Sequence, residues 1–251
     1  ERWPAMVFMK LFTGLGPLDA RSIGRDSLLR WMLALPLLIV VPVRLVLPPL
    51  LVRIGLTFGV DLKLFYPGIA SAVLLLITPV LYGLVIGFLL LDQRDDQTLT
   101  ALQITPLPVE HYLAYRLAAP TLLSYGMAVA AVLLAGLPNP HIWGLLLAGL
   151  VAALHTPLVA LGLACFAANK VQGLALMKAG SVLLAAPLVG LFVPSSWRYV
   201  FGVLPTYWPA TLYRQFQVGD QLAWGGLVFA LSYQALLLAI LLRRFRAVVL
   251  R

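Results

Sequence analysis

Charged side chains, which are the ones most able to do chemistry or to bind a partner, are concentrated in one stretch of this chain. Residues 92–116 hold four of the nine acidic residues of the sequence, namely Asp92, Asp95, Asp96 and Glu110. Arg94 and Arg116 lie in the same stretch, and long apolar segments flank it. Such charges can orient a docked partner through electrostatic complementarity. This stretch is therefore the first candidate for function.

The sequence offers little for catalysis. It contains no HExxH motif, no paired carboxylates within an apolar segment, and no serine and histidine at a helical spacing. The lone Cys165 excludes an intrachain disulfide and a multi-cysteine metal site. His155, inside an apolar segment, could be a proton relay or ligand, or a neutral structural residue. Because no apolar segment holds a carboxylate to partner it, we favour the structural role and predict that the chain is not an enzyme.

The composition indicates a membrane protein. Of the 251 residues, 62% are hydrophobic and 11% are charged, whereas soluble domains carry roughly 25% charged residues. Apolar runs of about 20 residues recur, and a helix of that length crosses a hydrocarbon core of roughly 30 Å. The sequence therefore predicts an all-α polytopic membrane protein with a single transmembrane domain over residues 1–251. The net charge of +9 comes from basic residues at the ends of apolar runs, which indicates membrane topology rather than nucleic-acid binding.

We predict six spans separated by short connections. Residues 1–30 have the spacing of an amphipathic helix in the interface plane, although a solvated lead-in remains an alternative. The aromatic segment 194–220 predicts short outer interfacial or re-entrant helices rather than a seventh span. The first span starts near Trp31, with Arg44 at its far end and an outer loop over 53–66. The other spans are predicted at about 67–91, 112–137, 141–167, 174–193 and 221–242.

Basic residues predict the orientation. If the N-terminal segment, the charged stretch 92–116, the connection near Asn169 and the C-terminal tail are cytoplasmic, 13 of the 18 Lys and Arg residues lie in the cytoplasm. An excess of Lys and Arg marks cytoplasmic loops. We therefore expect a multi-pass protein of a plasma (inner) membrane, with both termini cytoplasmic.

The loop 92–111 has the pattern of a short helix between two spans. Asp95 or Asp96 can cap its start, Leu99 and Leu102 share one face, and Pro106 ends the helix by Thr105. Two interpretations remain. The segment could seat its apolar face in a groove of a soluble partner and tilt both spans when pushed, or it could be a solvated turn that only sets topology.

This loop resembles the corresponding loop of ABC-2 type export permeases. The matching residues run from Asp92, Gln93, Arg94, Asp95, Asp96 and Gln97 to Thr98 and Leu99, and then Thr105, Pro106 and Leu107. Together with the segment FAANKVQGLALMK, the loop resembles the fluoroquinolone-exporter-like branch of that family. The chain departs from the commoner pattern at Asp92, where Glu is usual, and at Gln97, where Gly is usual.

The resemblance implies that two permease subunits, identical or related, pair in the membrane, and that each docks on a separate cytoplasmic ATPase. The chain agrees with this by lacking a GxxxxGK[ST] phosphate loop, so ATP and Mg would be bound by the ATPase and no cofactor by this chain. The expected coupling residues are Asp92, Arg94, Asp95, Asp96, Gln97, Thr98, Leu99, Leu102, Thr105 and Pro106. Asn169, Lys170 and Gln172 are either a second ATPase contact or a simple cytoplasmic turn.

The sequence thus predicts the permease subunit of a prokaryotic ABC exporter. Because the spans lack buried charge, the expected cargo is a hydrophobic or amphipathic small molecule, drug-like or lipid-like, moved outward. The alternative function is a non-transporting membrane anchor that recruits a cytoplasmic protein through the same loop. Expected partners are the ATPase, a second permease subunit and membrane lipid, but not nucleic acid.

Overall fold

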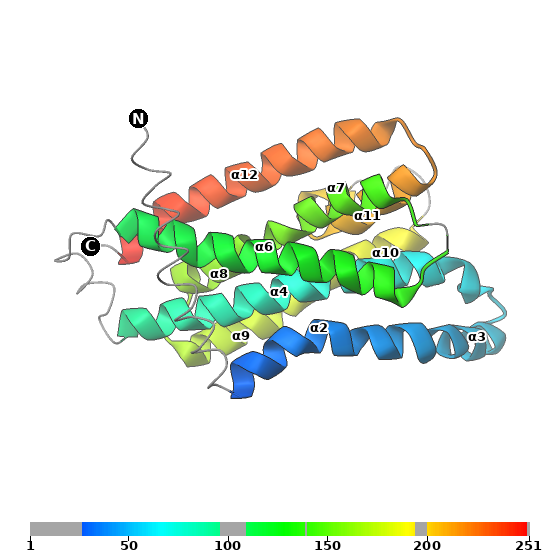
Figure 1. The fold of residues 1–251 in the computed structure, drawn as a ribbon, viewed down its shortest axis with the longest axis horizontal. Coiled ribbons are helices and arrows are strands. Elements are labelled where there is room, and N and C mark those ends of the chain that lie inside the picture. The colour runs from blue at the N-terminus through cyan, green and yellow to red at the C-terminus, as the bar shows by residue number, and fades with distance from the viewer. Residues whose placement is uncertain (1–26, 96–108, 139, 194–199, 250–251) are drawn as a thin grey trace.

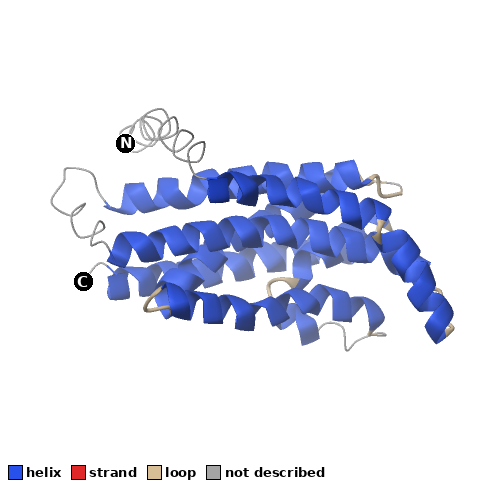
Figure 2. Ribbon diagram, turned by 90° about the horizontal axis from the view of Figure 1, so that it is seen from below, coloured by secondary structure: helices blue, strands red, loops and turns tan. Residues whose placement is uncertain are grey.

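The computed structural model describes residues 27–95, 109–138, 140–193 and 200–249, and within these ranges the regular elements are all helices (Figures 1 and 2). The helices run along one long axis as a bundle. Their bounds are α2 Ser27–Leu45, α3 Leu47–Phe58, η1 (3₁₀) Leu62–Phe65, α4 Tyr66–Asp95, α6 Val109–Ala135, α7 Ile142–Ala153, α8 His155–Phe166, α9 Lys170–Ser181, η2 (3₁₀) Val182–Ala185, α10 Ala186–Phe192, α11 Tyr207–Gln217 and α12 Leu222–Val249.

The predicted all-α polytopic membrane fold is confirmed. Five helical segments of the described chain are long and apolar enough to cross a membrane, and the bent pair Ala34–Leu45 and Leu47–Phe58 makes a sixth when it is counted as one span. The start of α2 and the end of α12 lie at the same end of the bundle (Figure 1), here called the terminal end. The predicted amphipathic helix over 1–30 falls mainly on residues outside the described ranges, since the description begins at Ser27.

The predicted outer loop over 53–66 is wrong, because most of it is helical. Helix α3 continues to Phe58 and ends at Gly59, whose φ of 67° lies in the left-handed region that glycine tolerates. The 3₁₀ helix η1 follows directly. Pro48 and Pro49 do not prevent α3, because they stand in its first turn, where a missing N–H costs nothing. The first span instead bends by 45° between α2 and α3.

Arg44 lies in the last turn of α2, next to the bend within the first span, rather than at the predicted far end of that span. Its Nη1 donates a hydrogen bond of 2.9 Å to the carbonyl oxygen of Leu134, near the C-terminal end of α6. A cation is favourable there because the last carbonyls of a helix lack backbone partners and carry partial negative charge. Gly136, whose φ of 65° lies in the left-handed region that glycine tolerates, follows α6 directly and lies beside the guanidinium.

Two spans that the sequence predicts as continuous are interrupted, each just before a proline. The fourth span is divided at Leu154 into α7 and α8, three residues before Pro157. The fifth is divided by η2 before Pro187, which cannot donate to the carbonyl of Leu183. That carbonyl instead accepts from the backbone N–H of Ala186 and from the hydroxyl of Thr206, the latter at 2.6 Å. Inside a membrane a freed carbonyl needs such an internal partner.

The segment that contains Thr206 enters the bundle from the end opposite the termini. Two hydrogen bonds join this segment to the middle of the fifth and sixth spans. Thr206 donates to the carbonyl of Leu183 in η2, and the Tyr233 hydroxyl of α12 donates to the carbonyl of Val203 at 2.6 Å. A short helix before the last span is present as predicted, namely α11. However, Tyr207 and Tyr213 are buried in the bundle, so these aromatic side chains do not anchor at headgroup level as we expected from their type. The packing of α11 against α7 and α12 buries them.

Helices α4 and α8 make the most extensive contact in the bundle. Two glycines one turn apart on α4 permit it. A Cβ atom at Gly83 would lie 2.7 Å from the carbonyl oxygen of Thr156, and one at Gly87 would lie 2.7 Å from a methyl group of Leu163. Small residues at this spacing let helix backbones approach closely in membranes. Beside this contact, the Thr156 hydroxyl bonds to Pro79 O of α4 at 3.1 Å and to the Ser124 hydroxyl of α6 at 2.8 Å.

We predict that Gly83→Ala destabilises the fold, because the added methyl group would collide with the backbone of α8. The expected loss is about 1–3 kcal/mol, measured as a lower thermal unfolding temperature of the purified chain in detergent. Gly126→Ala on α6 is the matched control, since nothing lies within 4 Å of a Cβ atom there. Equal unfolding temperatures for the two variants would contradict the close contact.

Candidate functional site

The charged stretch begins on a helix that reaches the terminal end of the bundle. Helix α4 continues through Asp92 and Arg94 to Asp95, beyond the predicted end of the second span near residue 91. Arg94 donates to the carbonyl oxygen of Ala168 at 2.5 Å and to that of Ala164 at 3.4 Å. The guanidinium therefore satisfies carbonyls at the C-terminal end of α8, where positive charge is favourable.

The structure joins the two regions that the sequence predicts separately as partner contacts. Lys170, at the start of α9, forms a salt bridge of 2.8 Å with Asp92. The two side chains are 58% and 37% exposed, so this pair contributes only about 0.2–1 kcal/mol. We call Asp92, Arg94, Ala168 and Lys170 the α4–α9 clasp. The clasp fixes the position of α9 relative to α4 at the terminal end.

Asn169 and Gln172 shape the turn next to the clasp. The Asn169 side chain caps α9 by accepting from the backbone N–H of Gln172 at 3.0 Å, and the Gln172 side chain accepts from the N–H of Ala168 at 2.8 Å. These reciprocal bonds resemble a capping box. They account for both residues by local structure, which favours the turn interpretation for Asn169 and Gln172. Lys170 alone of the three reaches the charged stretch.

Further contacts tie the clasp to the rest of the terminal end. The Gln93 side-chain amide donates to the Tyr112 hydroxyl of α6 at 2.8 Å. Arg244 of α12 lies 4.3 Å from the centroid of the Phe166 ring. Beneath these contacts is an apolar cluster from α4, α6, α8 and α12, which comprises Leu90, Leu113, Leu117, Ala160, Leu161, Ala164, Cys165 and Phe245. Four helices therefore meet in one packed unit under the clasp.

The remaining predicted coupling residues lie outside the described ranges. These are Asp96, Gln97, Thr98, Leu99, Leu102, Thr105 and Pro106. The helix before them ends at Asp95 and the helix after them begins at Val109. The predicted docking face therefore stays a prediction, although the structure places both of its attachment points at the terminal end (Figure 1).

The candidate histidines make local contacts with the backbone of their own span. His155 is buried and its Nδ1 lies 3.0 Å from the carbonyl oxygen of Ala152, in agreement with the structural role that we favour. His141 caps α7 by accepting from the N–H of Gly144 at 2.9 Å. No group of three or more His, Cys, Asp or Glu residues that could hold a metal ion occurs within the described ranges.

Sequence reasoning missed Gly83, Gly87, Gln93 and Tyr112 as residues that position the site. The Gly83 and Gly87 pair has the GxxxG spacing of a membrane-helix contact, so that signal was available. Gln93 and Tyr112 carry no local signal, because their hydrogen bond joins two helices across the charged stretch.

A bundle of helical spans with a charged junction at one end defines a polytopic membrane protein. A family model described as "Fluoroquinolones export permease protein Rv2686c-like" matches residues 19–242. Two relatives from Mycobacterium tuberculosis, named fluoroquinolones export permease protein MT2760 (strain CDC 1551 / Oshkosh) and Rv2686c (strain ATCC 25618 / H37Rv), are each 34% identical over 242 residues. Each match covers 95% of this chain and 95% of the relative.

The chain therefore belongs to the Rv2686c-like fluoroquinolone export permease family. This confirms the predicted resemblance to that branch, whereas the wider assignment to ABC-2 type permeases stays a prediction. No solved structure matches the chain significantly.

We predict that Arg94→Gln loosens the α4–α9 clasp, because the two carbonyls would lose a charged donor. Amide hydrogen exchange should become faster over residues 164–173. Lys170→Gln should have a smaller effect, since it removes only a half-exposed ion pair. Lys178→Gln, an exposed residue further along α9, serves as the control. Unchanged exchange in Arg94→Gln would contradict the role of the clasp.

Proposed function

We propose that the chain is the membrane subunit of an ABC exporter, which moves a hydrophobic or amphipathic small molecule outward across the plasma membrane. A separate cytoplasmic ATPase would bind ATP and Mg and supply the energy. A second permease subunit, identical or related, would complete the path. The observation that carries the proposal is the similarity to export permeases over 95% of the chain.

The terminal end supports the docking part of the proposal. The clasp brings the start of the charged stretch and the α8–α9 connection onto one surface. The ATPase would contact Leu99 and Leu102 through their shared face, with Arg94, Asp95 and Asp96 setting its orientation. Basic residues at the same end, such as Arg243 and Arg244, agree with a cytoplasmic location for this surface and for both termini.

The interior supports the cargo class. Among the described residues no charged side chain is fully buried, and the buried polar ones are Ser, Thr, His and Gln. Burying an unpaired charge in a membrane protein is expensive, so an interior of this kind fits an apolar or amphipathic molecule better than a polyanion. The names of the relatives agree with this class, since they are called fluoroquinolone export permeases.

A non-transporting anchor that recruits a cytoplasmic protein is the second candidate, because the same surface would serve it. Transport by vesicles distinguishes the two. The test uses inside-out vesicles that contain the chain and its co-purifying ATPase, so that the cytoplasmic face is turned to the medium. When ATP is added to the medium, these vesicles should accumulate a fluoroquinolone. ATPase binding without ATP-dependent accumulation would favour the anchor and contradict the exporter.

We predict that the double variant Leu99→Asp with Leu102→Asp loses the ATPase, because two charges on the apolar face would be desolvated on docking. The measurement is recovery of the ATPase when the chain is purified. Val60→Asp with Val218→Asp is the matched control, since both valines are exposed and lie outside the candidate spans, in connections at the opposite end. Full recovery with the first pair would refute docking through this face.

A further inference from the structure

Helix α3 and the 3₁₀ helix η1 form a compact turn at the end of the bundle opposite the termini (Figure 1). We call residues 47–65 the α3–η1 elbow. The N–H of Val60 donates to the carbonyl of Gly55 at 3.0 Å, and the Asp61 side chain accepts from the N–H of Lys63 at 3.0 Å. A Cβ atom at Gly55 would lie only 2.4 Å from the carbonyl oxygen of Val60, so the chain folds back tightly on α3. Hydrogen bonds within the elbow therefore fix its shape.

The elbow leans away from the bundle. Helix α3 is bent by 45° from α2, and Figure 2 shows the helix at the right-hand end turned out of the common axis. The contacts of α3 are mainly with its chain neighbours α2 and η1. The elbow is tied to another span by Phe65, whose ring centroid lies 4.8 Å from that of Phe192 at the end of α10. Much of the surface of α3 is consequently open to the surrounding medium.

Helix lengths place the elbow at the level of the lipid headgroups. Helix α4 has 30 residues, about 45 Å at 1.5 Å per residue, which matches the roughly 40–45 Å of a bilayer with both headgroup layers. The last turn of α4 holds charges of the α4–α9 clasp, which belong in one headgroup layer. The first residue of α4, Tyr66, directly follows η1, so the elbow lies in the opposite layer. Helix α2 alone, with 19 residues or about 28 Å, covers a hydrocarbon core of roughly 30 Å.

The open surface of the elbow combines large apolar side chains with cations. Leu56 and Leu64 are 80% and 79% exposed, the highest values among the large apolar side chains of the described residues, and Phe58 is 74% exposed. Arg53 on α3 and Lys63 on η1 are also exposed, and neither forms a salt bridge with another described residue. Apolar side chains beside cations are typical of segments that lie in a membrane interface.

We propose that the α3–η1 elbow binds the phospholipid surface of the leaflet opposite the terminal end. Leu56, Phe58 and Leu64 enter the boundary between headgroups and acyl chains, and Arg53 and Lys63 pair with lipid phosphates. Helix α3 is then an interfacial helix rather than the end of the first span, and the elbow holds the adjoining ends of α2 and α4 at a fixed depth. The inference does not depend on the proposed exporter.

Two other surroundings fit less well. Water would leave the three most exposed apolar side chains of the elbow without an apolar environment. The same surface of a second copy would bring Arg53 and Lys63 of one chain towards those of the other, and like charges repel. A phospholipid supplies the opposite charge through its phosphate and apolar contact through its acyl chains.

The test measures the depth of single spin labels on the purified full chain in phosphatidylcholine nanodiscs. Each label is attached to one introduced cysteine in a Cys165→Ser background, at Phe58, at Asp95 in the exposed end of α4, or at Leu236 in the middle of α12. Relaxation by oxygen, which concentrates in the membrane, and by a water-soluble nickel chelate gives the depth. The label at 58 should lie roughly 5–10 Å below the headgroups, deeper than the label at 95 and shallower than the label at 236.

Charges at the apolar positions should lift the elbow out of the leaflet. In the double variant Leu56→Asp with Leu64→Asp, the label at 58 should become as accessible to the nickel chelate as the label at 95, because carboxylates avoid the acyl chains. The matched control, Leu56→Met with Leu64→Met, stays apolar and should leave the depth unchanged. A label at 236 that stays deep in both variants shows that the bundle is intact.

Removing the cations should weaken the attachment to the phosphates. In Arg53→Gln with Lys63→Gln, the label at 58 should move towards water, by less than in the Asp pair because the apolar side chains remain. Arg243→Gln with Arg244→Gln, on α12 near the terminal end, is the control and should leave the label in place. No shift with the first pair would contradict phosphate binding.

The depth of the label at 58 in the otherwise unmodified chain can also overturn the inference. Nickel accessibility equal to that at 95 would place the elbow in water. A depth equal to that at 236 would make α3 part of a span. Protection from both reagents would mean that another protein surface covers the elbow. An unchanged depth in the Asp pair would show that the apolar side chains do not hold it in the leaflet.

Discussion

The close approach of α4 and α8 at Gly83 and Gly87 is the contact on which the rest of the bundle depends. Between membrane helices water does not drive association, so close packing and internal hydrogen bonds must hold them together. The glycines bring the backbones together, and the Thr156 hydroxyl then reaches both Pro79 O and Ser124. This arrangement lets the fourth span break at Leu154 without separating from its neighbours.

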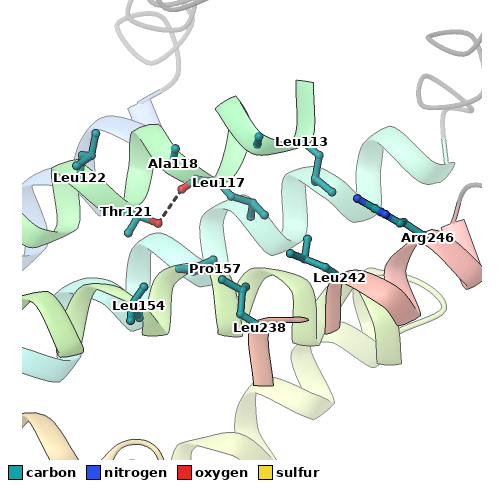
Figure 3. Close-up of a pocket in the computed structure, with 11 residues that line it drawn as sticks. Leu113, Leu117, Ala118, Thr121, Leu122, Leu154, Pro157, Leu238, Leu242 and Arg246 are labelled. Atoms are coloured by element: carbon teal, nitrogen blue, oxygen red, sulfur yellow. Dashed lines mark hydrogen bonds between the residues drawn. The ribbon is translucent and has the colours of Figure 1, made fainter. Parts of the chain in front are cut away.

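The same pair connects the middle of the bundle to the terminal end. Helix α4 ends in Asp92, Arg94 and Asp95, α8 leads into the turn before Lys170, and the α4–α9 clasp joins the two ends. At the other end of α8, Leu154 and Pro157 line a cavity between α6 and α12 (Figure 3). A partner that pushed on the clasp would therefore act on α4 and α8 together.

Much of this architecture could be predicted from the sequence, because hydropathy indicates which segments form long apolar helices. The interruptions were harder to predict. Pro157 and Pro187 can be read directly from the sequence. Whether a proline kinks or breaks a span, however, depends on the partners of the nearby carbonyls. One such partner, Thr206, lies 23 residues from Leu183. Residues 53–58 looked like a loop because of their polar neighbours, yet nothing in them ends a helix before Gly59. The Asp92 to Lys170 pair joins separate loops, which spacing alone does not reveal.

The most direct test of this account is whether α4 and α9 move as one unit when the ATPase binds nucleotide. Two doubly spin-labelled variants are made in a Cys165→Ser background, one labelled at the exposed positions Asp95 and Val171 and the other at Val171 and Val248. Pulsed electron paramagnetic resonance then measures the 95–171 and 171–248 distances in the complex with the ATPase. The account predicts that the 171–248 distance changes on addition of ATP while the 95–171 distance stays constant. A change in the 95–171 distance, or no change in either, would contradict it.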